Sequence, residues 1–230
     1  MQFSGFQKLT LLDYPEKTAC TLFTAGCNFR CPFCHNAALV THIDNTVFFT
    51  EDYVLDYLKK RTGVLDGVCI TGGEPLMHPD LPEFIKKVKS LGYLVKLDTN
   101  GSYPERLAEL IDSGLIDYVA MDIKNCKEKY LLTAECSKDD LINVEKSVDI
   151  LKRGKTDYEF RTTVVKEYHE IDDIKKIAEW IAPSEKYFLQ NFIDSGDLIK
   201  NNLSAHTRET LDLMQLSAQY IIKKVEIRGI

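Results

Sequence analysis

Three cysteines lie close together in the first part of the chain, and their spacing indicates metal chemistry. Cys27, Cys31 and Cys34 form the pattern C-x3-C-x2-C, with no fourth cysteine near enough in sequence to complete a local set of four. Thiolates are soft ligands that select iron–sulfur clusters or zinc. Three thiolates on a [4Fe–4S] cluster leave one iron without a protein ligand, as a catalytic metal keeps an open position. The pattern therefore favours a cluster that binds a small molecule at its fourth iron.

Two other interpretations of the three cysteines stay open on spacing alone. His35 directly follows Cys34, so a structural zinc site of three thiolates and one imidazole has the right ligand types. Adjacent residues seldom both turn their side chains onto one metal, which weighs against this site. A buried group of free thiols is the remaining interpretation, and it leaves the crowding of the cysteines without a chemical reason.

An aromatic residue, Phe33, precedes the last cysteine, and with it the motif resembles the signature of the radical S-adenosylmethionine (SAM) enzymes. The wider string from 23 to 36 resembles the activating enzymes of glycyl-radical proteins. The leader at 5–8 and 11–15 is most similar to activators of anaerobic ribonucleoside-triphosphate reductase. Glu16 departs from that subfamily, whose members usually carry glycine there. The resemblance covers nearly the whole chain.

The resemblance implies a reaction and its partners. Cys27, Cys31 and Cys34 would hold a [4Fe–4S] cluster whose fourth iron binds SAM through its amino and carboxylate groups. A reduced cluster would cleave SAM to methionine and a 5′-deoxyadenosyl radical, which would take a hydrogen from a glycine of a partner protein. The implied partners are the anaerobic reductase and a low-potential electron donor such as flavodoxin or ferredoxin.

Three alternative functions stand beside this one. The target can be another glycyl-radical enzyme, of the pyruvate formate-lyase type. The chain can also be a radical SAM enzyme that acts on a small molecule, such as a deazapurine precursor. Without a cluster, the same cysteines would make a zinc-binding module that is not an enzyme.

Composition excludes several classes of protein. The 230 residues are 44% hydrophobic, enough to bury a sizeable core. The net charge of −6 and the lack of a long basic run make nucleic acid and anionic membranes poor partners. No secretory signal and no apolar stretch of membrane-spanning length is present in the sequence. The odd number of cysteines, seven, then favours a reducing cytoplasm.

Strands alternate with helices along the chain, which predicts right-handed βαβ units and a parallel sheet. Six such strands are too few for a closed barrel of eight, so we expect an α/β fold, a partial open (β/α)6 TIM-like barrel with helices outside. The expected strands are 18–23, 67–71, 94–99, 117–124, 158–165, 187–192 and a terminal one at 224–228. The expected helices are 50–61, 80–91, 104–113, 138–153, 171–181 and 207–222.

The same pattern predicts one domain over residues 1–230, without a linker. An N-terminal strand or hairpin at 1–16 precedes the partial barrel core at 17–193, and a C-terminal helix and strand follow at 194–230. In such folds functional groups gather at the carboxyl ends of the strands. The polar and glycine-rich motifs of this sequence fall at those ends, one strand after another.

The second predicted strand ends in Thr71-Gly72-Gly73-Glu74. Two glycines let a backbone approach a ligand closely, and a glutamate can accept hydrogen bonds from an ammonium group. The family resemblance assigns Gly72, Gly73 and Glu74 to the amino group of SAM, and it counts Asn36 among the SAM-binding residues. An ordinary turn with a solvated glutamate explains the same residues equally well.

The next two strands both end in aspartate, Asp98 and Asp122. Neighbouring carboxylates repel each other unless a cation compensates them. Resemblance to the activator of pyruvate formate-lyase implies that Asp98, Thr99 and Asp122 hold a monovalent cation beside SAM, and Asn100 is expected to bind SAM too. Lys124 provides the competing account, a plain ion pair with Asp122. It is also a candidate catalytic residue in contact with the substrate.

Two later strands complete the predicted site. Arg161 is costly inside an apolar strand unless it is paired or faces a polar cavity. The family resemblance implies a position against the carboxylate or ribose of SAM. A buried ion pair without a ligand is the alternative. Gln190 ends the sixth strand and is expected to meet the adenosine, while Phe33 packs near the adenine.

The remaining histidines and cysteines have no partner at ligand spacing. The polar segment between Cys126 and Cys136 is expected to be loop-rich, without a second cluster. Four histidines are expected to be ordinary surface residues: His42, His78, His169 and His206.

Overall fold

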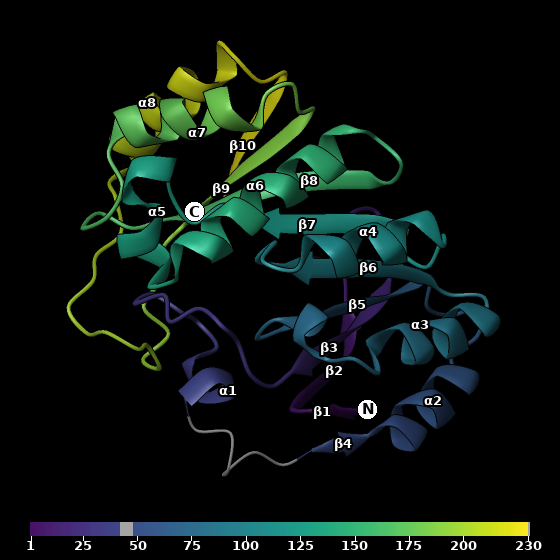
Figure 1. Cartoon of the computed structure of the whole chain (residues 1–230). Coiled ribbons are helices and arrows are strands. Elements are labelled where there is room, and N and C mark those ends of the chain that lie inside the picture. The colour runs from purple at the N-terminus through teal and green to yellow at the C-terminus, as the bar shows by residue number, and fades with distance from the viewer. Residues whose placement is uncertain (42–47, 230) are drawn as a thin grey trace.

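The computed structural model describes residues 1–41 and 48–229, and one curved sheet forms its centre (Figure 1). Within these residues the sheet has eight strands in the order β10-β9-β8-β7-β6-β5-β3-β2. Their bounds are β2 (Gly5–Thr10), β3 (Ala19–Thr24), β5 (Gly67–Gly72), β6 (Leu94–Thr99), β7 (Tyr118–Asp122), β8 (Asp157–Val164), β9 (Lys186–Asn191) and β10 (Lys224–Arg228). Two short strands, β1 (Gln2–Phe3) and β4 (Phe49–Thr50), pair separately with each other.

All neighbours from β3 to β10 are parallel, and only β2 runs antiparallel, along β3. β2 and β10 form the two edges and do not pair with each other, so the sheet does not close. This confirms the predicted open, partial barrel. The six expected strands are present, and β10 continues the sheet as one more parallel strand.

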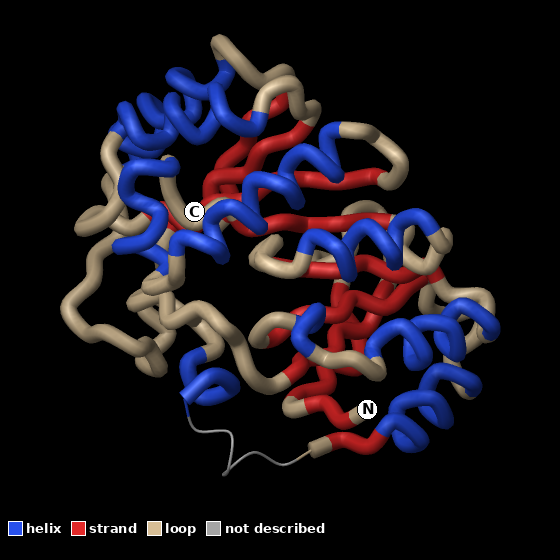
Figure 2. Tube along the Cα trace, viewed as in Figure 1, coloured by secondary structure: helices blue, strands red, loops and turns tan. Residues whose placement is uncertain are grey.

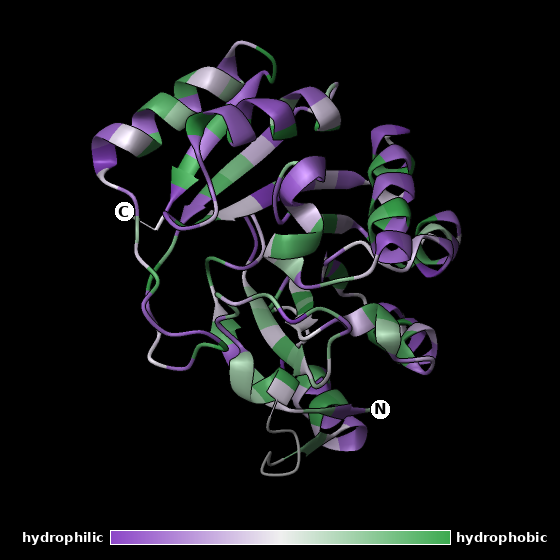
Figure 3. Cartoon of the chain, turned by 60° about the vertical axis from the view of Figure 1, so that its left-hand side comes forward, coloured by the Kyte–Doolittle hydropathy of each residue, from purple (hydrophilic) through white to green (hydrophobic). Residues whose placement is uncertain are grey.

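The longer helices lie along the outer side of the curved sheet (Figure 2). Their bounds are α2 (Glu51–Lys59), α3 (Leu81–Ser90), α4 (Pro104–Asp112), α6 (Lys138–Lys152), α7 (Ile171–Ile181) and α8 (Arg208–Gln219). Each is amphipathic: α3, for example, buries Leu81, Phe84, Ile85 and Val88, which share one face of the helix, and its lysines point outward. Figure 3 shows the resulting bands of hydrophobic and hydrophilic residues.

Capping residues in the sequence mark where these helices begin and end. Thr50 caps α2, since its hydroxyl oxygen accepts a hydrogen bond of 3.3 Å from the backbone N–H of Tyr53. Pro104 opens α4, where its missing N–H costs nothing. Gly92 follows α3 with φ = +89°, a conformation that favours glycine.

One predicted loop is wrong. The segment between Cys126 and Cys136 contains a helix, α5 (Lys127–Ala134), which ends at Glu135 in a left-handed conformation. The helix buries Tyr130 beside Trp180, while Leu132 is 71% exposed. Its apolar residues therefore do not form one clean face, which is why the sequence pattern did not reveal it.

Two smaller elements complete the described part of the chain. α1 (Ala37–Thr41) and the 3-10 turn η2 (Pro75–Met77) follow the cysteine motif and the Gly-Gly-Glu motif, and both lie at the end of the sheet where the site is found. No helix among the described residues is long and apolar enough to cross a membrane.

Candidate functional site

A cavity of about 430 Å³ opens at the carboxyl ends of the parallel strands. The three motif cysteines line it together with most of the other predicted site residues. The predicted residues on its wall are Cys27, Cys31, Phe33, Cys34, Asn36, Gly72, Gly73, Asp98, Thr99, Asn100, Asp122, Lys124, Arg161 and Gln190. Glu74 is missing from this wall. The structure thus brings into one place groups that are up to 163 residues apart in sequence (190 − 27).

The cysteine loop leaves β3 and is held from two sides. Gly26, with φ = +84°, turns the chain, and its N–H donates to the carbonyl of Leu39 at 2.9 Å. On the other side the N–H of Arg30 donates to the carbonyl of Ala134 at the end of α5, at 3.1 Å. Helix α5, which the sequence analysis did not predict, therefore supports the cysteine loop, which the sequence predicted most clearly.

Among the described residues, the sulfur atoms of Cys27 and Cys31 have few hydrogen-bond partners of their own. The N–H of Phe29 and the amide of Asn100 approach Cys27 Sγ at 3.4 and 3.7 Å, and Cys31 Sγ lies 3.7 Å from the carbonyl of Ala134. Burial raises the pKa of the Cys27 thiol to about 11 and that of Cys31 to about 12. A metal centre bound here would displace these protons, because the ligand is the thiolate.

The donor set fits a cluster better than a single zinc ion. Among the described residues no three His, Cys, Asp or Glu side chains gather around one ion position, and zinc needs its sulfur ligands about 2.3 Å from one point. His35 lies on the cavity wall with its ring 5.8 Å from that of Phe192. Cys27, Cys31 and Cys34 all line one cavity, and three thiolates suit an iron–sulfur cluster that keeps one iron open.

The two glycines of the Gly-Gly-Glu motif are required by the backbone itself. A Cβ on Gly73 would lie 1.8 Å from the carbonyl oxygen of Gly26, and one on Gly72 would lie 2.4 Å from the backbone of Thr24. The N–H of Gly73 donates to the carbonyl of Thr24 at 2.9 Å. The motif therefore packs directly against the chain that leads into Cys27.

Glu74 does not lie where the sequence interpretation placed it. Its side chain is fully buried, and its carboxylate accepts hydrogen bonds from the N–H of Leu76, the hydroxyl of Thr99 and the N–H of Asn100, at 2.7–3.0 Å. Burial raises the pKa of Glu74 to about 7. With both oxygens engaged in hydrogen bonds, Glu74 ties the ends of β5 and β6 together.

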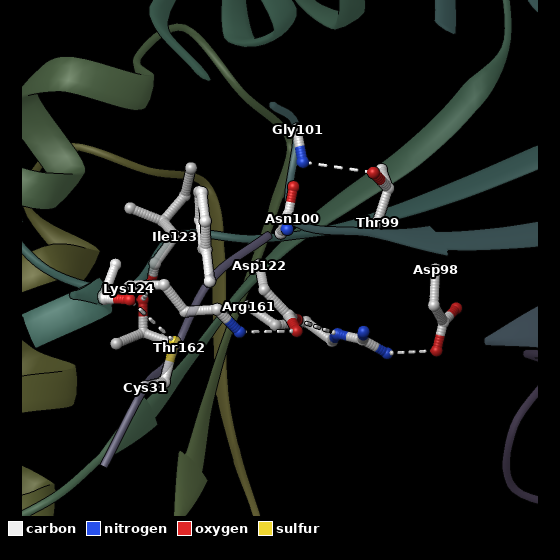
Figure 4. Close-up of polar contacts among 12 residues, drawn as sticks. Cys31, Asp98, Thr99, Asn100, Gly101, Asp122, Ile123, Lys124, Arg161 and Thr162 are labelled. Atoms are coloured by element: carbon white, nitrogen blue, oxygen red, sulfur yellow. Dashed lines mark hydrogen bonds and ion pairs between the residues drawn. The ribbon is translucent and has the colours of Figure 1, made fainter. Parts of the chain in front are cut away.

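Arg161 joins the two predicted aspartates (Figure 4). Its Nε donates to Asp122 Oδ1 at 2.8 Å, and one terminal nitrogen donates to Asp98 Oδ2 at 3.1 Å. Lys124 Nζ reaches the other oxygen of Asp122 at 3.1 Å. Arg161 is 12% exposed, so it is both buried in ion pairs and part of the cavity wall.

Lys96 is a member of this group that the sequence interpretation missed. It is almost fully buried and pairs with Asp98, while its Nζ lies 3.8 Å from Cys69 Sγ. A signal was available, because Lys96 and Asp98 are two apart on one strand and share a face. We call Lys96, Asp98, Arg161, Asp122 and Lys124 the charge ladder.

The charge ladder removes the reason for a monovalent cation. Three cations of the protein, from Lys96, Arg161 and Lys124, already compensate Asp98 and Asp122. The charges hold the pKa of Asp122 down at about 2 even though burial raises it. The competing account, an ion pair of Lys124 with Asp122, is the one that the structure contains.

The smaller polar residues of the wall make contacts that hold the loops. Asn36 donates to the carbonyl of Gly72 at 3.0 Å, and Asn100 donates to Asn28 Oδ1 at 3.0 Å. Gln190 is half-buried where the cavity meets a second hollow of about 380 Å³, which it also lines. These positions agree with a cofactor-binding wall.

The prediction of surface positions for the histidines is wrong for His169, which is fully buried. His78 and His206 also have partners, since their ring nitrogens lie 2.9 Å from the carbonyls of Ala25 and His169. The fourth, His42, lies outside the described residues. No pattern in the sequence around His169 indicates its burial, which depends on a contact 45 residues away.

Known proteins resemble this chain in sequence. A family model described as the radical SAM superfamily matches residues 21–181. A protein of Methanocaldococcus jannaschii, provisionally named a glycyl-radical enzyme activating enzyme, is 35% identical over 194 residues, which cover 82% of this chain and 79% of that protein. A GTP 3′,8-cyclase of Helicobacter pylori is 30% identical over 208 residues, 86% of this chain and 62% of the cyclase.

The fold is also found among solved structures. The crystal structure of a radical SAM methyltransferase from Sphaerobacter thermophilus superposes with a TM-score of 0.70, over 96% of this chain and 69% of that one. The two sequences are only 12% identical, so this likeness concerns the fold alone.

Proposed function

The chain belongs to the radical SAM superfamily, and we propose that it is an activating enzyme that generates a glycyl radical on a partner protein. The family implies a [4Fe–4S] cluster and SAM. When bound, this pair supplies the electron and the carbon–sulfur cleavage that yield a 5′-deoxyadenosyl radical. The observation that carries the proposal is the placing of Cys27, Cys31 and Cys34 on one cavity wall without a fourth cysteine.

The residues of the wall suit these two groups. Cys27, Cys31 and Cys34 would hold the cluster and leave one position open. Arg161 and Lys124 of the charge ladder line the cavity beside Asp98 and Asp122. Their remaining N–H groups can donate to an anionic group there, such as the carboxylate of SAM.

A partner protein suits the open sheet. Because β2 and β10 do not meet, the cavity is not enclosed by a complete ring of strands. A loop of another protein can therefore approach the wall from outside, which a small substrate would not require. The resemblance to the Methanocaldococcus protein supports the same class of partner, since glycyl-radical enzyme activation is the role for which that protein is named.

Within this class we propose anaerobic ribonucleoside-triphosphate reductase as the partner, with flavodoxin or ferredoxin as electron donor. The support is the leader at 5–8 and 11–15, which resembles activators of that reductase. In the structure, Asp13 of this leader lines the cavity and accepts a hydrogen bond from Thr21 at 2.5 Å. The leader is therefore in a position to distinguish between partners.

A radical SAM enzyme for a small molecule is the second candidate function. It is favoured by the Helicobacter GTP 3′,8-cyclase, whose reaction by its name uses a nucleotide. This chain spans only 62% of that cyclase, so part of the cyclase has no counterpart in the aligned region.

The test is anaerobic reconstitution with iron and sulfide, followed by reduction in the presence of SAM. The proposed function predicts 5′-deoxyadenosine, and with the reductase added it predicts a glycyl-radical signal in electron paramagnetic resonance. Cleavage of SAM together with turnover of GTP, and no protein radical, would support the second candidate. A colourless protein that binds zinc and leaves SAM intact would rule out both.

A further inference from the structure

His169 lies between the end of β8 and the start of α7, and both of its ring nitrogens have partners inside the protein. The N–H of Val165 donates to Nδ1 at 3.1 Å, and Nε2 lies 2.8 Å from the carbonyl oxygen of Lys124. His169 is fully buried. A polar group buried to this degree is expected to be hydrogen-bonded, and this one is bonded at both ends.

The carbonyl oxygen of Val165 also lies 3.3 Å from Nδ1, but the shorter contacts with the N–H of Val165 and the carbonyl of Lys124 favour one tautomer. A backbone N–H can only donate, so Nδ1 of His169 accepts from Val165 and carries no proton. A backbone carbonyl can only accept, so Nε2 carries the proton and donates it to Lys124. Burial lowers the pKa of His169, which agrees with a neutral ring. Neither nitrogen is free to bind a metal or to exchange a proton with a substrate.

The bond from His169 is one of several that hold the loop after β7. Before Lys124, the N–H of Ile123 donates to the carbonyl of Arg161 at 2.8 Å. After it, the amide of Asn125 donates to the carbonyl of Tyr168 at 3.0 Å. Lys124 itself is held by His169. Its ammonium group is thereby directed into the cavity, where it pairs with Asp122.

The ring of His169 also contacts the cysteine loop. Phe33, which lies between Cys31 and Cys34, packs its ring against His169 with centroids 6.2 Å apart at 70°, and against Tyr168 at 5.9 Å. Phe33 is buried. One imidazole therefore touches both sides of the cavity wall, the loop that carries the sulfur atoms and the loop that carries the ammonium group.

We propose that His169 is a positioning residue, which holds Lys124 and the Phe33 side of the cysteine loop in register by its donation to the carbonyl of Lys124. The inference rests on the proposed function only in that these two loops face the bound cofactor. Without this bond, the carbonyl of Lys124 loses a buried donor, and both loops gain freedom relative to each other.

Three substitutions separate the two hydrogen bonds and the ring. In His169→Gln the side-chain nitrogen replaces Nε2 and keeps the donation to Lys124. In His169→Asn the side-chain oxygen replaces Nδ1 and keeps the bond from Val165. His169→Phe keeps the ring and loses both bonds. Tyr93→Phe is the matched control, because it removes one buried donor to a carbonyl, that of Leu58 at 2.7 Å, away from the cavity.

The first measurement needs no cofactor. In the cluster-free protein, alkylation of Cys31 and Cys34 by iodoacetamide is followed by peptide mass spectrometry. We expect about tenfold faster alkylation in His169→Asn and His169→Phe than in the wild type, because both variants lack the buried hydrogen bond to the carbonyl of Lys124. His169→Gln and Tyr93→Phe are expected to remain within about twofold of the wild type.

The second measurement uses the reconstituted protein. The Kd for SAM is expected to rise about tenfold in His169→Asn and His169→Phe. The electron paramagnetic resonance spectrum of the reduced cluster with SAM should also change in these two variants. Both quantities should change little in His169→Gln. Equal behaviour of the glutamine and asparagine variants overturns the proposal, as does a Tyr93→Phe effect as large as that of His169→Phe. If the phenylalanine variant does not fold, the glutamine and asparagine pair decides alone. Failure of SAM cleavage in the wild type would reject the proposed function. The ranking of the variants by alkylation rate would still test the role of His169, because that measurement needs no cofactor.

Discussion

The cysteine loop and four of the five charge-ladder residues (Asp98, Asp122, Lys124 and Arg161) line the same cavity, but the polar atoms of the loop and of the ladder are satisfied in opposite ways. In the ladder, each of Asp98 and Asp122 is paired with two cations of the protein itself. In the loop, the sulfur atoms of Cys27 and Cys31 have only weak contacts of 3.4 to 3.7 Å. The ladder is complete within the protein, whereas the loop needs a bound group to complete it.

This difference separates two kinds of polar residue at a strand end: those that stabilise the site and those that are available to bind a ligand. Buried ionic groups without partners cost several kcal/mol, so groups that are fully paired inside the protein can be structural whatever the family motif suggests. Glu74 is the clearest example, since three donors of the protein occupy its carboxylate. Arg161 and Lys124 belong to both classes, because they are paired and still line the cavity.

Replacing a cysteine of the loop is expected to have the largest effect. Cys31→Ala removes one of only three sulfur ligands, so we expect loss of the brown cluster and of all SAM cleavage. Iron content, visible absorbance and 5′-deoxyadenosine measure this. Cys136→Ala is the control, because that half-buried cysteine does not line the cavity. A Cys31→Ala protein that still cleaves SAM would show that the loop does not hold the cluster.

Breaking the ladder at its centre is expected to have the next largest effect, on stability. Arg161→Leu leaves Asp98 and Asp122 each with one cation and removes the group between them. Loss of a partner from a buried ion pair costs about 3–5 kcal/mol, measured by urea denaturation of the cluster-free protein. The exposed pair Arg208–Asp212 provides the control, since Arg208→Leu should cost about 0.5 kcal/mol or less. Equal losses in the two variants would mean that the ladder is not a stabilising unit.

The two regions also differ in how well the sequence predicted them. The cysteine loop is a local motif, so its spacing alone pointed to the site. Asp98, Asp122 and Arg161 were found because strand ends of a parallel sheet meet at one edge. His169 was missed because its burial depends on Lys124, which lies 45 positions earlier in the chain.

The direction of Glu74 was missed for a different reason. Alternation along a strand predicts which side chains share a face, but two glycines precede Glu74 and Gly72 has φ = +114°. After such a turn the alternation no longer holds. The position of Lys96, in contrast, could have been predicted from the alternation, since it lies two residues before Asp98 on a regular strand.

Glu74 gives a prediction for the pH dependence of stability. Its pKa is about 7 in the folded protein against an ordinary value of 4.5. The folded protein therefore holds the proton more tightly, so this contribution to stability is complete below pH 4.5 and is lost as the pH rises through 7. The loss amounts to about 3 kcal/mol, at 1.36 kcal/mol per pH unit. The free energy of unfolding against pH measures it in the cluster-free protein.

Glu74→Gln should flatten this part of the pH profile, because glutamine does not titrate. The exposed Glu109→Gln has the same change of charge and should follow the wild-type profile. A Glu74→Gln profile as steep as that of the wild type would assign the pH dependence to other groups. The result bears on the comparison, since it tests whether Glu74 belongs with the internally satisfied groups.

The smallest effect is expected at the inner end of the charge ladder. Lys96→Met keeps most of the volume and removes the charge, while Asp98 retains Arg161 at 3.1 Å. We therefore expect a loss of about 1–2 kcal/mol, below that of Arg161→Leu, because Lys96→Met takes a partner from one carboxylate and Arg161→Leu takes a partner from both. Urea denaturation measures it, with Lys155→Met in the exposed pair with Asp112 as the control. If Lys96→Met costs as much as Arg161→Leu, then Arg161 does not compensate Asp98, and the charge of Asp98 depends on Lys96 alone.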